Sequence, residues 1–66
     1  MYVQGKKLEI GDKLVYNSIS GGQVKVRVIM TYDHAVDIKV TSRKNIYPLN
    51  YPMRIQEGSP WLELRK

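Results

Sequence analysis

The stretch VKVRVIMTYDHAVDIKV, residues 24–40, constrains the fold of this chain more than any other part of the sequence. Apolar and polar residues alternate on both sides of a central Tyr-Asp-His segment, which is the period of a strand with one buried face. Most of the apolar positions hold valine or isoleucine, which favour strands. The stretch therefore predicts an antiparallel hairpin with its valines inside and its lysines and arginine outside.

The length of the hairpin loop follows from the requirement that the two apolar faces coincide. A two-residue loop over 33–34 would place Met30 opposite Asp37, which sets a core side chain beside a charge. A three-residue loop over 32–34 pairs Met30 with Val36 and keeps the apolar positions together. We therefore predict the three-residue loop, although a β-bulge would produce the same odd count.

The predicted outer face of the hairpin is basic. Arg27 is expected opposite Lys39, and Lys25 lies on the same face. Like charges directly across a strand pair are unfavourable, so this pair hints at an anionic ligand. The alternative is that both long side chains extend into water. Ile29 is an apolar residue on this polar face and favours a different use of it, as a protein contact.

Strand and turn signals continue through the rest of the chain, and helix signals are almost absent. Residues 8–16 resemble two short β segments around a Gly-Asp turn, and Pro60 opens a last strand with Leu62 and Leu64 inward. We expect one all-β domain over residues 1–66, because a chain of 66 residues is short for two. A chain this short gains stability from a closed barrel or from an oligomer.

The order of these elements resembles the SH3-like small barrels, including the KOW and Tudor-type modules. In these modules a Gly-Asp-x-Val-x-Val strand leads into a hairpin, and here that opening is Gly11-Asp12-Lys13-Leu14-Val15-Tyr16. The resemblance covers about residues 8–65. It implies a small five-stranded antiparallel SH3-like barrel with one long loop around 41–52, and it implies no specific ligand.

Composition excludes several classes of function. The chain has no cysteine and one histidine, so we expect no disulfide, no metal site and no cofactor. None of the serines is placed as a nucleophile, and no glycine-rich loop precedes a helix, so we expect no enzyme activity. No apolar run approaches the roughly 18 residues of a membrane span, and no signal-peptide core is present, which together predict a cytoplasmic protein without a membrane partner.

The net charge and the 41–52 loop both favour an anionic partner. Eleven lysines and arginines against six acidic residues give +5. The loop combines Arg43 and Lys44 with two Tyr-Pro pairs, and aromatic faces beside cations suit unpaired bases and their phosphates. The alternative is that part of the loop folds back to cap the barrel.

We therefore expect a non-catalytic binding module for DNA or RNA. The predicted nucleic-acid-binding residues are Lys25, Arg27, Lys39, Arg43, Lys44, Arg54, Tyr47, Tyr51 and Trp61. The alternative function is a protein–protein interaction or self-assembly module, with a protein partner or a homo-oligomer formed through a peptide groove or an exposed strand edge.

Overall fold

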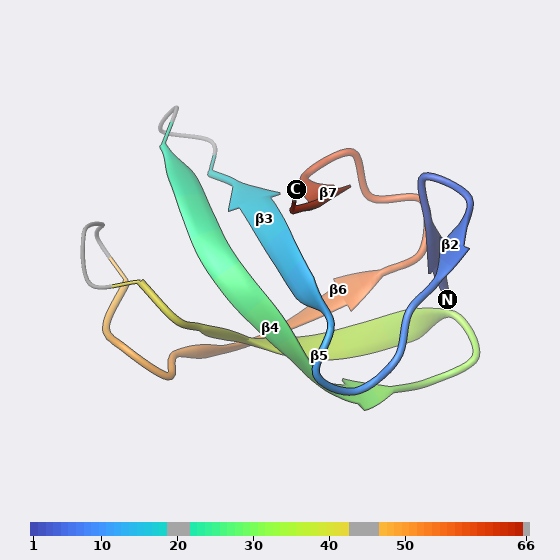
Figure 1. Ribbon diagram of the computed structural model, residues 1–66, viewed down its shortest axis with the longest axis horizontal. Helices are drawn as coiled ribbons and strands as arrows, with labels where there is room; N and C mark the ends of the chain where they lie inside the picture. Colours follow the sequence, from blue (N-terminus) through green and yellow to red (C-terminus); the bar gives the residue numbers. More distant parts are fainter. Residues whose placement is uncertain (19–21, 43–46, 66) are drawn as a thin grey trace.

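The computed structural model describes residues 1–18, 22–42 and 47–65, and this part of the chain is all-β (Figure 1). Its strands form one two-stranded and one five-stranded sheet, both antiparallel. The strands are β1 (Tyr2–Val3), β2 (Lys6–Lys7), β3 (Lys13–Asn17), β4 (Gln23–Thr31), β5 (Ala35–Val40), β6 (Pro52–Gln56) and β7 (Leu62–Leu64). The predicted all-β class is confirmed.

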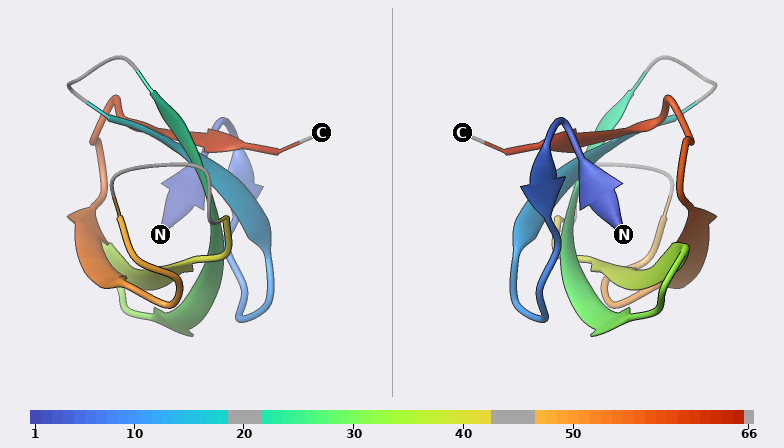
Figure 2. Two further views of the ribbon diagram at one scale, coloured as in Figure 1. Left: turned by 90° about the vertical axis from the view of Figure 1, so that its left-hand side faces the viewer. Right: turned by 90° about the vertical axis from the view of Figure 1, so that its right-hand side faces the viewer.

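The five-stranded sheet curls around its core without closing into a barrel (Figure 2). Strands β3 to β6 follow one another as neighbours, and β7 returns to pair with β3, which gives the order β6-β5-β4-β3-β7. The sheet therefore has two edges, β6 and β7. The five antiparallel strands are confirmed, and the closed SH3-like barrel stays a prediction.

The core confirms the predicted inner face of the central hairpin. Val26 pairs with Val40, and Val28 pairs with Ile38. The side chains that are fully buried all come from the alternating positions of β3, β4 and β5, where a strand turns every second residue inward. They are Leu14, Val24, Val26, Val28, Val36, Ile38 and Val40.

The loop of this hairpin differs from the prediction. The register shifts between Val28 and Met30, so that Met30 faces Asp37 and is 46% exposed. The Tyr32 N–H donates to the carbonyl of Ala35 at 2.9 Å. A bulge at Ile29 and a two-residue loop thus replace the predicted three-residue loop. The bulge keeps the valines inside and still permits the tighter turn, but it turns Met30 outward.

The segment before β3 is a turn and not the strand that the sequence predicted. The carboxylate of Asp12 accepts the Glu9 N–H at 2.9 Å, which holds residues 9–12 in a local turn. Gly11 has a φ of 95° and donates its N–H to the carbonyl of Val28 at 2.8 Å. This left-handed conformation favours glycine. The Gly-Asp pair therefore forms the turn that leads into β3, the first strand of the five-stranded sheet.

A short N-terminal hairpin, β1–β2, was not predicted. Gln4 and Gly5 both have positive φ values, 50° and 83°, as a type I′ turn requires. The hairpin contacts β7, where the Leu64 N–H donates to the Gln4 side chain at 2.9 Å. On the other side the Tyr2 N–H donates to the Glu57 carboxylate just after β6, at 3.0 Å. The hairpin therefore lies between the two edge strands, as the right-hand view of Figure 2 shows. Its strands are too short for an alternating pattern to reveal them.

Candidate nucleic-acid interface

Four cationic residues line up across the outer face of the sheet, one at each of four neighbouring strands. Arg27 on β4 pairs directly with Lys13 on β3 and, on its other side, with Lys39 on β5. The Arg65 N–H, just after β7, donates to the carbonyl of Lys13 at 3.3 Å, which brings Arg65 level with Lys13. We call these four residues the basic row. Since neighbouring strands lie about 4.8 Å apart, the row is about 14 Å long when measured along the curled sheet.

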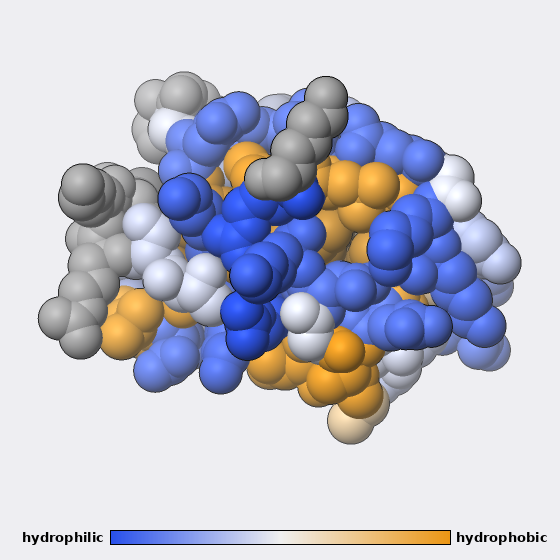
Figure 3. Space-filling model, in the orientation of Figure 1, coloured by the Kyte–Doolittle hydropathy of each residue, from blue (hydrophilic) through white to orange (hydrophobic). Residues whose placement is uncertain are grey.

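Lys25 extends the same basic surface. It lies two residues before Arg27, on the same face of β4, and its direct partner on β3 is Val15. The outer face of β3 and β4 points toward the viewer in Figure 3, where strongly hydrophilic residues occupy the middle of the molecule. The predicted residues Lys25, Arg27 and Lys39 therefore lie together on one face.

The carboxylates near this face do not neutralise the basic row. Asp37 could have relieved the Arg27–Lys39 pair, but its carboxylate accepts a hydrogen bond from Arg54 Nε at 2.8 Å. Glu63 lies opposite Val15 on the β7 side of the sheet. Within the part of the chain that the structure describes, neither the four residues of the basic row nor Lys25 forms an ion pair.

Arg54, which was predicted to contact phosphate, lies in a separate cluster on β5 and β6. Its guanidinium carbon is 4.8 Å from the centre of the Tyr32 ring, and its Nη2 donates to the Tyr32 hydroxyl at 3.2 Å. Hydrogen bonds from Arg54 and then from Tyr32 lower the pKa of Asp37, and Asp37 in turn raises the pKa of Arg54. The charge of Arg54 is therefore already matched within the protein.

The two predicted tyrosines differ in burial: Tyr47 packs against the core, whereas the Tyr51 side chain is 40% exposed. The Tyr47 ring is 5.3 Å from that of Tyr51 and meets that of Tyr16 edge-on at 6.4 Å. Tyr16 and Tyr47 pack against the core, and the carbonyl of Tyr51 accepts the Val40 N–H at 3.1 Å. The alternative in which part of the loop folds back onto the core is supported for Tyr47 only, because the Leu49 side chain is 42% exposed and Ile46 lies outside the described residues. Arg43 and Lys44 lie outside the described residues.

Trp61 lies on the outer side but away from the basic row. Its carbonyl accepts the Asn17 N–H at 2.7 Å, and its side chain is 41% exposed. Trp61 and Arg65 are four residues apart along an extended chain, which corresponds to about 13 Å. The structure therefore leaves a wide gap between this aromatic residue and the cations.

Two members of the basic row, Lys13 and Arg65, were missing from the predicted set. The sequence does carry their orientation, because each follows or precedes a leucine that turns inward, Leu14 or Leu64. It does not show that β7 returns to β3 and brings Arg65 beside Lys13. The row therefore became visible only through the pairing of distant strands.

Two hollows adjoin this region. The first, of about 390 Å³, lies at the β7 end of the basic row and is lined by Lys6, Gly11, Asp12, Lys13, Leu64 and Arg65. Within it, Lys6 Nζ lies 2.7 Å from Asp12 and lowers the pKa of that carboxyl, as does the hydrogen bond from the Glu9 N–H. The net charge of its lining favours an anion.

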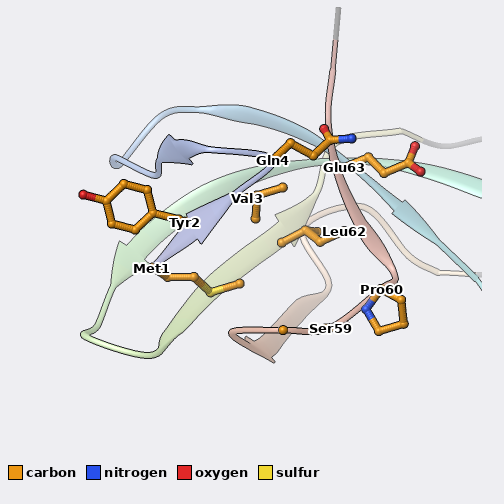
Figure 4. A pocket seen from close by; sticks show the side chains of 9 residues that line it. Met1, Tyr2, Val3, Gln4, Ser59, Pro60, Leu62 and Glu63 are labelled. Atoms are coloured by element: carbon orange, nitrogen blue, oxygen red, sulfur yellow. The ribbon is translucent and has the colours of Figure 1, made fainter.

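The second hollow, of about 320 Å³, lies between the N-terminal hairpin and β7 (Figure 4). The side chains of Met1, Val3 and Leu62 form its apolar wall, with Gln4 and Glu63 at the rim. Neither lysine nor arginine lines it among the described residues. It therefore does not extend the basic surface.

Neither a metal centre nor a membrane span emerges from the described residues. They contain no group of three or more His, Asp or Glu side chains that could hold a metal ion. The single histidine, His34, is exposed and lies 3.5 Å from the Glu57 carboxylate. The same residues include no helix with the length and apolarity to cross a membrane.

Comparison with known proteins assigns no family to the chain. No protein-family model, curated protein or solved structure matches it. The functional argument therefore depends on the residues and on their geometry.

Proposed function

We propose that this protein is a non-catalytic module that binds nucleic acid through the outer face of its sheet. The observation that carries the proposal is the basic row, in which Arg27 has a cation directly across from it on both sides. The phosphates of a nucleic acid are the complementary charges, and the counterions that they release on binding supply affinity without any sequence-specific contact.

The arrangement is difficult to explain by solvation alone. A cation on a strand surface is hydrated equally well at any outward position, but directly opposed like charges destabilise a sheet. The described part of the chain places three such cations in direct register, Lys13, Arg27 and Lys39, and leaves them without carboxylate partners. A ligand with closely spaced negative charges removes this repulsion when it binds.

Fluorescence anisotropy with a labelled oligonucleotide tests the proposal. We expect binding at low salt that weakens steeply as salt rises, and further weakening in Arg27→Gln. The matched control is Lys7→Gln, which makes the same change of charge at an exposed residue that lines a separate hollow beside Tyr32 and Asp33. Binding to neither a single strand nor a duplex at low salt would refute the proposal, as would equal losses in the two variants.

A second candidate function, protein interaction, has its own supporting observation. The bulge leaves Ile29 and Met30 39% and 46% exposed, near the end of β4. An adjacent hollow of about 210 Å³ is lined by Ile29, Pro52 and Met53 together with the Asp37–Arg54 pair. Pro52 and Met53 belong to the edge strand β6, where another chain could add a strand. Sedimentation as a strict monomer at high concentration would count against self-assembly.

The proposal includes two further predictions, that the domain is related to the closed SH3-like barrels and that the protein is cytoplasmic. In support of a barrel relative, one missing strand pairing, between β6 and β7, separates the sheet from closure, and the N-terminal hairpin occupies that gap. In support of a cytoplasmic location, the chain contains no cysteine. Cell fractionation with a tagged chain tests the second prediction.

A further inference from the structure

The geometry points to a double-stranded nucleic acid as the ligand, bound through the phosphates of both strands by the basic row. This inference rests on the proposed function and specifies its substrate class. It follows from two features of the outer face: the length of the row, and the separation between the cations and the aromatic residues.

The length of the row matches the spacing of phosphates across a groove. The row runs across the strands from Arg65 to Lys39 and measures about 14 Å along the curled sheet, while the major groove of B-DNA is about 12 Å wide. The two ends of the row can therefore reach phosphates on opposite strands of one duplex. Lys13 and Arg27 lie between them, and Lys25 adds one more cation beside Arg27.

Single-stranded binding needs aromatic faces that alternate with the cations, so that unpaired bases stack while phosphates are neutralised. This surface does not provide them. Trp61 stands about 13 Å along the chain from Arg65, Tyr47 packs with Tyr16 against the core, and the partly exposed Tyr51 ring is held against Tyr47 at 5.3 Å. The register partners of the row and of Lys25 are other cations, Val15 and Pro52, and Glu63 lies opposite Val15; none of these residues is aromatic. The bases of a duplex already stack on one another, so a protein that binds the duplex needs no aromatic stacking surface.

The experiment compares a duplex of about 20 base pairs with a single strand of the same length, between about 50 mM and 200 mM salt. Five phosphate contacts give a slope of log affinity against log salt of about −4.5 for a duplex, which is about a 500-fold loss over this range, and about −3.5 for a single strand. We expect tighter binding and the steeper slope with the duplex. Lys39→Gln and Lys13→Gln should each reduce the duplex slope by about 1, and Lys7→Gln should not change it.

Trp61→Ala provides an independent arm of the test. Because the protein contacts the phosphates of the duplex only through the basic row and Lys25, we expect this variant to bind the duplex as the parent chain does. Tighter binding to the single strand than to the duplex, or a large loss of duplex binding in Trp61→Ala, would overturn the inference and leave the proposed function standing. Absence of binding to both probes would instead remove the proposed function itself. Circular dichroism of each variant verifies that these surface changes leave the fold intact.

Discussion

Replacement of Arg27 by glutamine should make the protein more stable and its nucleic-acid binding weaker. Arg27 has two directly opposed like charges, Lys13 and Lys39, and each such pair costs a few tenths of a kcal/mol. Removal of the central charge relieves both pairs at once, so the free energy of unfolding should rise by about 0.5–1 kcal/mol at low salt. For a chain of this length the melting temperature should increase by about 2 to 8 °C.

Thermal unfolding followed by circular dichroism, at about 10 mM and about 1 M salt, measures this gain. At the higher salt the screening length is about 3 Å, which is shorter than the distance between strands, so the gain should almost disappear. Lys25→Gln is the matched control, because it removes one charge from the same face at a position whose partner is Val15. Its effect on stability should be smaller.

Two results would refute this reasoning. One is an Arg27→Gln variant that is no more stable than the parent at low salt, since the opposed cations would then cost nothing. The other is a gain in stability that persists at high salt, since it would not be electrostatic. An increase in stability together with a loss of binding is the combination expected where a binding site is maintained at a cost to the fold.

Three further predictions concern the fold. Ile38→Ala removes a fully buried side chain and should lower the free energy of unfolding by about 2–5 kcal/mol in urea titration, so an unchanged midpoint would contradict the assigned core. Gly5→Ala should lower the free energy of unfolding by about 1 kcal/mol by the same measurement, because its φ of 83° is unfavourable for alanine. No atom lies within 4 Å of the added methyl group, so a steric clash does not contribute. Gly22→Ala, also in open space but without a positive φ, is the control. The pKa values of Asp12 and Asp37 are lowered in the folded state by hydrogen bonds from Lys6 and Arg54, so their contribution to stability is present above about pH 4 and is lost as the pH falls through the folded values. Asn replacements at both positions should therefore flatten the acid limb of a stability–pH curve, and an unchanged limb would show that these pairs do not contribute.

Much of the candidate surface could be predicted from the sequence because a strand repeats every second residue. This period alone places Lys25, Arg27 and Lys39 outside while the valines lie inside, and the structure agrees. The same period predicted Met30 inward, and this was wrong because the bulge at Ile29 inserts one residue without any local signal. The aromatic residues of the 41–52 loop carried no period at all, so the sequence did not show that Tyr47 packs against the core while Tyr51 stays 40% exposed.

The sequence by itself determined the all-β class, the inner and outer faces of the central hairpin and the basic character of the outer face. These properties depend on neighbours in the chain and on the alternation of side chains. Only the tertiary structure decided that β7 returns to β3, that the N-terminal hairpin lies between the edge strands and that Asp37 is held by Arg54. Each of these three features brings together residues that are far apart in sequence. Each also depends on which surfaces are left unpaired once the sheet has curled. The basic row needs both contributions, because local alternation turns each cation outward and long-range pairing sets the four of them side by side.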